Sequence, residues 1–160
     1  MTSTEPSGST TSARPSDQPA AALCDALATE HSVIYGYGMV SAHSDAELNP
    51  LVSAALNEHR QRRDDVIAML AARSVTAPVA AAGYQLPMPL TNATDAARLA
   101  VRMEGDTAVA WRAVVEQAKT SDDRGFGTNA LTQSAVLAAR WNQVLGVFPL
   151  TTAFPGGSEH

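Results

Sequence analysis

The sequence predicts an all-α protein, a four-helix bundle with a long crossover between the second and third helices. Three observations support this fold class. Hydrophobic residues make up 45% of the chain but aromatic residues only 5%, a balance that favours closely packed helices over a sheet. Apolar residues recur at helical spacing in four stretches. Helix-breaking residues gather in one long segment between the second and third stretches.

The chain of 160 residues is expected to form one domain with short tails. Residues 1–18 are mostly Ser, Thr, Pro, Glu, Asp and Gly, without a Leu, Ile, Val or aromatic side chain. Such a segment has too little apolar surface to offset the entropy of ordering. We therefore predict a disordered N-terminal tail over 1–18, the bundle over 19–156 and a C-terminal tail over 157–160.

The first helix is expected to run from Pro19 to about His43. Glu30 takes a place in its apolar stripe where a hydrophobic residue should stand. Gly36 and Gly38 lie about two turns further on, where a small residue allows a close approach of another helix or side chain. The apolar members of the stripe are Leu23, Leu27, Ile34 and Tyr37.

The second helix is expected from Asn49-Pro50 to about Arg73, antiparallel to the first. Asn49 can cap this helix, and Pro50 suits its first position. His59 and either Arg62 or Arg63 interrupt its apolar stripe, much as Glu30 interrupts the first. The apolar members here are Leu48, Val52, Ala55, Val66 and Leu70.

The segment 74–92 is too rich in Pro and Gly to continue a helix. The second helix should be about 36 Å long at 1.5 Å per residue, and about 19 extended residues can span more than that distance. The linker can therefore return along the whole bundle, which would make the third helix parallel to the second.

The third helix should begin near Asn92–Asp95, with Asn92 or Thr94 as its cap, and it carries Glu104 beside an apolar face. A connection over residues 121–127, with Gly125 and Gly127, is expected before the fourth helix. That helix should end at Phe148-Pro149, after which the Phe residues of the C-terminal segment could cover one end of the bundle.

These interruptions predict a buried polar centre formed by Glu30, Tyr37, His59, Arg62, Arg63 and Glu104. One interpretation is a network of ion pairs, because buried carboxylates need partners and Arg can supply a cation. Another is a single metal ion held by Glu30, His59 and Glu104, and a third is a degenerate catalytic or ligand-binding pocket.

His31 and His43 are expected at the surface or at a helix end. Tyr35, Tyr37, Trp111 and Trp141 are expected in the core, with a cofactor pocket as the alternative.

Several motifs resemble an actinobacterial ferritin-like family known as a domain of unknown function. They span about Pro19 to Gly156, nearly the whole folded part, and occur in the family's order. They are Glu30-His31, Tyr35-Gly36-Tyr37-Gly38, His59-Arg60-Gln61-Arg62-Arg63-Asp64, Tyr84-Gln85-Leu86-Pro87, Glu104 with Trp111, and Phe154-Pro155-Gly156. The resemblance implies a ferritin-like four-helix bundle and no established activity.

Ferritin-like di-metal proteins place a Glu on each of two helices and a Glu-x-x-His pair on each of the other two. Under the resemblance, Glu30 and Glu104 match the two single glutamates. The second helix has Glu58 followed by Gln61 in place of His, and the fourth has no Asp, Glu or His from Thr128 to Gly146. The resemblance therefore implies a degenerate di-metal site, and the expected cofactor is none, with iron or manganese as the alternative.

Charge and cysteine usage narrow the function classes. A net charge of −5 gives no basic surface for nucleic acid. No apolar run is long enough to span a bilayer or serve as a secretion signal. Cys24 is the only cysteine and is expected in the core, so a reducing compartment, the cytoplasm, is the simplest location.

The predicted function is binding or assembly, as a homodimer formed through exposed apolar helix faces. The partner could also be another protein or a small ligand, with neither nucleic acid nor membrane expected. The alternative is an iron- or manganese-dependent oxidoreductase with an incomplete or mononuclear site at Glu30, His59 and Glu104. The sequence names no catalytic residue, and it favours a protein that is not an enzyme.

Overall fold

The computed structural model describes residues 13–157. Its helices are α1 (Gln18–His43), α2 (Asn49–Ala71), α3 (Ala93–Gln117) and α4 (Ser121–Leu145), with a short 3-10 turn, η1 (Ala46–Leu48), before α2. Within 13–157 there is no strand, so the all-α prediction is confirmed. The tail predicted over 1–18 falls mainly on residues 1–12, which lie outside the described residues, as do residues 158–160 of the predicted C-terminal tail.

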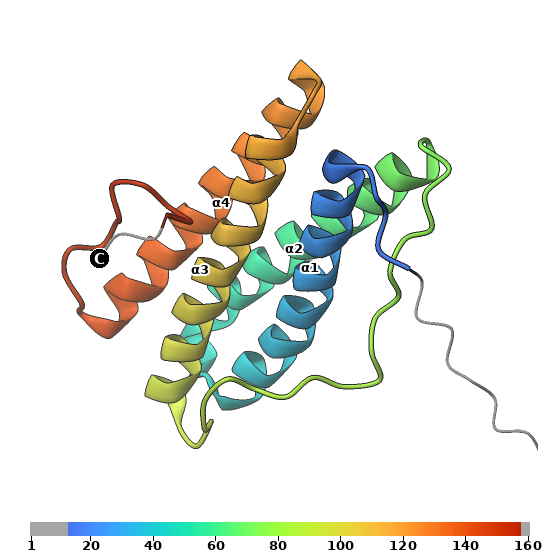
Figure 1. Ribbon diagram of the computed structural model, residues 1–160. Coiled ribbons are helices and arrows are strands. Elements are labelled where there is room, and N and C mark those ends of the chain that lie inside the picture. Colours follow the sequence, from blue (N-terminus) through green and yellow to red (C-terminus); the bar gives the residue numbers. More distant parts are fainter. Residues whose placement is uncertain (1–12, 158–160) are drawn as a thin grey trace, which may run out of the picture.

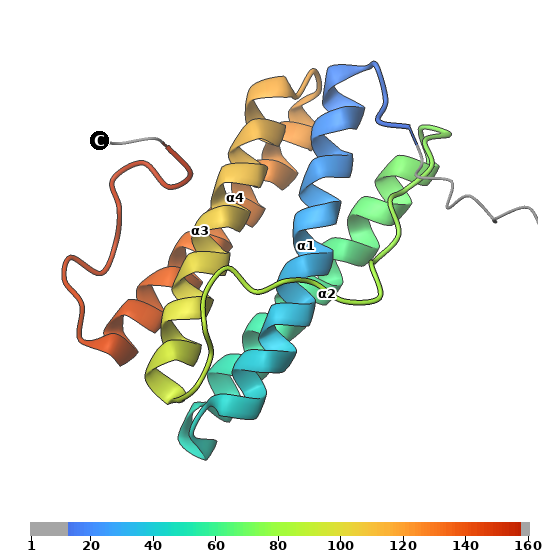
Figure 2. The same ribbon diagram turned by 60° about the horizontal axis from the view of Figure 1, so that its bottom comes forward.

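The four helices follow the predicted order of directions (Figures 1 and 2). The chain descends along α1 and returns along α2; the segment 72–92 then leads back to the other end of the bundle, so that α3 runs parallel to α2. This segment crosses over α1, where the His31 imidazole lies 3.1 Å from the Pro78 carbonyl oxygen and the Tyr35 and Tyr84 rings are 5.6 Å apart. The long crossover between the second and third helices is confirmed.

Side-chain caps fix three of the four helix starts. The Asp17 carboxylate accepts from the Ala20 N–H at α1, and the Asn92 side chain accepts from the Asp95 N–H at α3. Each cap satisfies one of the N–H groups that a helix start leaves without a partner. The prediction for α2 is wrong in detail: Asn49 is the first residue of that helix, and the preceding Leu48 gives no side-chain cap.

The fourth helix begins earlier than the sequence predicts. Thr120 caps α4 by accepting from the Asp123 N–H, and Asp122 and Asp123 place negative charge at the positive end of the helix. The expected connection over 121–127 is therefore wrong, and Gly125 and Gly127 lie inside α4. At Gly127 a Cβ would lie 3.0 Å from Cγ2 of Val115, so this glycine serves the close packing of α4 on α3.

The core has two apolar layers with a polar layer between them. One apolar layer includes Val40, Ala55 and Trp141, and the other includes Leu27, Val66 and Val114. Along every helix the chain passes from one apolar layer to the other at mid-length, and all but one of the buried polar residues stand at that crossing. They are Glu30 on α1, His59 and Arg62 on α2, Glu104 and Thr107 on α3, and Ser134 on α4; the exception is Asp123, in the first turn of α4.

The C-terminal segment does not cover an end of the bundle with its Phe side chains. Gly146 ends α4 in the left-handed conformation, and the segment then turns back beside α3 and α4 (Figure 2). Phe148 and Phe154 remain 77% and 66% exposed. Gly156, also at positive φ, sits against the Ala108 backbone so closely that a Cβ would clash with it. The segment therefore docks through backbone contact and small residues.

None of the helices described is long and apolar enough to cross a membrane.

Candidate functional site

The polar layer brings together side chains from all four helices. Its charged members are Glu30 from α1, His59 and Arg62 from α2, and Glu104 from α3, and none of them is more than 3% exposed. Isolated buried charges are expensive, so their partners decide whether such a layer is stable. The hydrogen bonds between them supply most of those partners.

His59 joins the two carboxylates. Its Nδ1 lies 2.6 Å from Oε2 of Glu30, and its Nε2 lies 3.0 Å from Oε1 of Glu104. Both contacts are hydrogen bonds when each ring nitrogen carries a proton, which is the state of a positively charged imidazole. The α2 histidine thus bridges α1 and α3 through charge-assisted bonds.

Arg62 supplies the second cation. Its Nη1 donates to Oε1 of Glu30 at 3.1 Å and contacts Oγ of Ser134 at 3.0 Å, which links α2 to α4. The same Glu30 oxygen accepts from Nε1 of Trp111 at 2.7 Å. Glu30 therefore has three donors from three different residues, and the charge on its carboxylate is well compensated.

Glu104 is held by a second chain of hydrogen bonds. The Tyr37 hydroxyl donates to Oε1 of Glu104 at 2.5 Å, and Nε1 of Trp141 donates to the Tyr37 oxygen at 2.9 Å. The Tyr37 and His59 rings lie 5.4 Å apart. A tryptophan thus supports each carboxylate: Trp111 donates directly to Glu30, whereas Trp141 donates to the Tyr37 hydroxyl that in turn donates to Glu104.

The ionisation of the layer follows from these contacts. Burial of the imidazole opposes its protonation, but the hydrogen bonds and charges of Glu104 and Glu30 outweigh it and raise the pKa of His59 to about 9. Burial also acts against ionised Glu30, yet His59 and Arg62 keep the pKa of that carboxyl below its ordinary value. Burial and the Glu104 charge raise the pKa of Tyr37 well above 10, so the phenol stays neutral. With His59 protonated, two carboxylates balance two cations.

Three buried polar atoms of the layer have no hydrogen-bond partner: Nε and Nη2 of Arg62, and Oε2 of Glu104. Glu104 also lines a small cavity of about 70 Å³ that is closed on one side by residues 150–156. A cavity of that size can hold water. An unpaired carboxylate oxygen and two unpaired guanidinium nitrogens leave the layer some capacity to bind a further small polar group.

Five of the six residues predicted for the polar centre meet there: Glu30, Tyr37, His59, Arg62 and Glu104. The expectation for Arg63 is wrong. Its guanidinium lies at the protein surface and pairs with Asp64 at 2.8 Å, because the helical rotation of 100° from Arg62 carries it off the buried face. The sequence did not predict that Trp111, Trp141 and Ser134 form hydrogen bonds within the polar layer. For the two tryptophans a signal was present, because a buried indole N–H needs an acceptor.

The residues of the layer do not fit a di-metal centre. The α4 helix contributes Ser134 and Trp141 to it, and neither is a carboxylate or an imidazole. Both nitrogens of His59 are occupied by hydrogen bonds to carboxylates. Over residues 13–157 no group of three or more His, Cys, Asp or Glu side chains is arranged to hold a metal ion.

Other residues singled out in the sequence lie outside the layer. Cys24 is 8% exposed in the apolar layer that contains Leu27, and burial raises the pKa of its thiol. His43 is the last residue of α1, at the predicted helix end, and Nδ1 of its ring lies 2.9 Å from the Met39 carbonyl oxygen. Tyr35, expected in the core, is instead 40% exposed against the crossover segment.

Comparison with known proteins places these features in a family. Residues 22–159 match a family described as a domain of unknown function, DUF4439. Among solved structures, the chain is similar to a conserved hypothetical protein, rv2844, from Mycobacterium tuberculosis. That similarity has 66% sequence identity and a TM-score of 0.80, and covers 81% of this chain and 98% of the other. No curated protein matches. Because the family match covers most of its length, the chain belongs to the DUF4439 family.

Proposed function

We propose that this protein is a ferritin-like helical module that acts by binding and assembly, not by metal chemistry. The ferritin-like assignment is supported by the direction of the helices, with α2 and α3 parallel across one long crossover. The single cysteine, Cys24, supports a location in a reducing compartment such as the cytoplasm.

One observation carries the proposal: a cation of the protein itself, His59, stands between the two buried carboxylates, and a second, Arg62, pairs with Glu30. Arg62 and His59 contact Glu30 at 3.1 and 2.6 Å, and His59 reaches Glu104 at 3.0 Å. A metal ion coordinated by these carboxylates would have to displace the two cations or suffer their repulsion. The layer therefore holds the helices in register instead of forming a reactive centre.

The assembly part of the proposal is supported by the outer face of α4. Val136 and Val144 are 48% and 43% exposed there, and they line hollows that α4 shares with α2. Apolar surface gathered beside a groove is typical of a binding site for another molecule. A second copy of the chain is the partner we infer.

Metal loading tests the proposal. Protein purified without chelators is incubated anaerobically with ferrous or manganous ion, desalted and subjected to elemental analysis, with Glu104→Ala in parallel. We expect far less than one metal ion per chain in both proteins. Near-stoichiometric metal in the native chain that disappears in Glu104→Ala would overturn the proposal.

The second candidate is an iron- or manganese-dependent oxidoreductase with a mononuclear site at Glu30, His59 and Glu104. The observation that favours it is the unpaired Oε2 of Glu104, a buried carboxylate oxygen free to take a ligand. In that case the loaded native chain should consume oxygen with a reductant present, and Glu104→Ala should not.

A further inference from the structure

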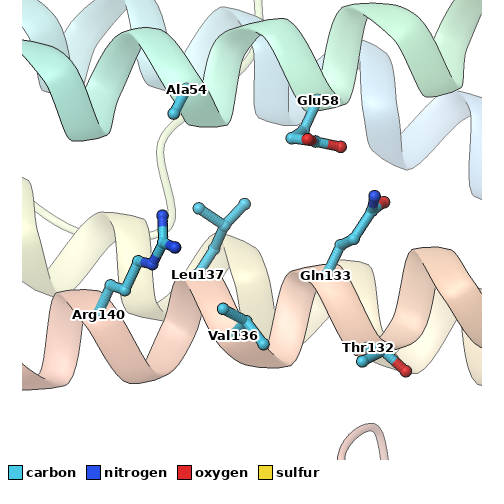
Figure 3. A pocket seen from close by; sticks show the side chains of 7 residues that line it. All are labelled: Ala54, Glu58, Thr132, Gln133, Val136, Leu137 and Arg140. Carbon is cyan, nitrogen blue, oxygen red and sulfur yellow. The ribbon is translucent and has the colours of Figure 1, made fainter.

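A groove runs between α2 and α4 on the outside of the bundle (Figure 3). Its central part has a volume of about 220 Å³. From there the groove continues to Leu51 at the start of α2 and Val144 at the end of α4. Figure 3 shows side chains of α2 and α4 facing each other across it. The residues that line the central part are Ala54, Glu58, Thr132, Gln133, Val136, Leu137 and Arg140.

The helices on either side of this groove are tied together at two places outside it. Arg62 of α2 bonds Ser134 of α4 in the polar layer, and Arg73 just beyond α2 pairs with Asp123 in the first turn of α4. The close packing of α4 is with α3, where Gly127 meets Val115. On the side that faces the first half of α2, α4 is not closely packed, and this gap is the groove.

The groove carries two opposite charges that have no partner among residues 13–157. Glu58 and Arg140 both line it, and over residues 13–157 neither makes a side-chain hydrogen bond or ion pair. Elsewhere in the bundle, Arg63 of α2 pairs with Asp64 at 2.8 Å, and Arg102 of α3 pairs with Asp106 at 3.0 Å. Figure 3 shows Arg140 at one end of the groove and Glu58 displaced towards the other. Apolar side chains, chiefly Val136 and Leu137, lie between them.

We propose that a second copy of this chain docks on the α2–α4 groove about a two-fold axis, with Glu58 of each copy against Arg140 of the other. In a two-fold dimer the same surface meets itself, so each pair of contacts occurs twice. A groove that holds an acidic and a basic side chain at separate positions, with apolar surface between, is complementary to its own copy. This inference rests on the assembly part of the proposed function and names its surface.

Reciprocal charge reversal tests the pairing. The masses of the native chain, Glu58→Arg, Arg140→Glu and the double variant Glu58→Arg/Arg140→Glu are measured by size-exclusion chromatography with light scattering over a range of concentrations. We expect a dimer for the native chain and at least a tenfold rise in the dimer dissociation constant for each single variant. The double variant should recover most of that loss, because the pair is restored with its charges exchanged.

Arg60→Glu is the matched control, since Arg60 is an exposed residue of α2 that does not line the groove. It should leave the mass unchanged, and circular dichroism should show the same helix content in every variant. A dimer that none of the groove variants weakens would overturn the location of the interface. A native monomer at all concentrations would overturn the second copy as the occupant. Metal uptake tests a different part of the proposed function, namely that the polar layer is not a metal site. It is measured separately, so either proposal can be contradicted without the other.

Discussion

Among single residues, His59 and Arg62 should matter most for stability, because they compensate the charges of the two buried carboxylates. Arg62 reaches Glu30 and Ser134 with one nitrogen, so it touches both α1 and α4. Removing one member of a buried ion pair costs more than the pair contributes, since the remaining charge stays in the interior without its partner. The network therefore makes these residues sensitive to substitution in a way that surface charges are not.

Arg62→Ala should lower the free energy of unfolding by about 3 kcal/mol or more. Glu30 would keep its bonds from His59 and Trp111 but lose one of two cations, and a cavity would remain where the guanidinium packs. Urea unfolding followed by circular dichroism measures the change. Arg60→Ala, an exposed position on the same helix, should change stability by less than about 0.5 kcal/mol. Equal effects of the two substitutions would contradict the buried network.

At the scale of helices, small residues decide how closely α3 and α4 approach. Gly125 and Gly127 lie two residues apart in the second turn of α4, and they differ in what surrounds them. A Cβ at Gly125 would meet no atom within 4 Å, whereas one at Gly127 would lie 3.0 and 3.3 Å from the valine side chains at positions 115 and 114. One glycine is thus open to solvent and the other is part of a helix contact.

Gly125→Ala should raise the free energy of unfolding by about 0.5–1 kcal/mol, because Ala has a higher helix propensity than Gly. Gly127→Ala should lose that gain or destabilise the protein, since the valines of α3 must move to admit the methyl group. Thermal or urea unfolding of the two variants gives the comparison. If residues 121–127 formed a connection instead of a helix, Gly125→Ala would give no gain in stability.

For the whole molecule, the charge state of one imidazole is linked to the stability of the bundle. The folded pKa of His59, about 9, lies above the ordinary value of 6.5 for an unfolded histidine. A raised pKa stabilises the fold fully below about pH 6.5, and this contribution disappears as the pH rises through about 9. Ionised Glu30 acts in the opposite range, because its lowered pKa stabilises the fold above about pH 4.5.

The free energy of unfolding should therefore fall between about pH 6.5 and pH 9, by on the order of 3 kcal/mol. Urea titrations at several pH values measure this fall, and the His59→Gln variant should show a much smaller one. An NMR titration of the His59 ring in the native chain gives an independent check if that variant does not fold. A ring that titrates near pH 6.5 would contradict the doubly hydrogen-bonded imidazole.

The sequence by itself determined the helices, the crossover and most of the polar centre. Periodic apolar residues and helix breakers are local signals, so they located α1 to α3 to within a few residues. Glu30, His59 and Glu104 were found because each interrupts an apolar stripe, and a charged residue in that place must face the interior. The capping of α3 by Asn92 followed from the same kind of local chemistry.

Only the tertiary structure decided between Arg62 and Arg63, because a one-residue step around a helix changes which face a side chain occupies, and the stripe alone left both open. It also decided that Gly125 and Gly127 continue a helix, since the Thr120 cap and the packing on Val115 outweigh the low helix propensity of glycine. The bonds of Trp111 and Trp141 and the groove holding Glu58 and Arg140 join residues far apart in the chain. Contacts of that kind depend on how helices pack, which no local pattern records.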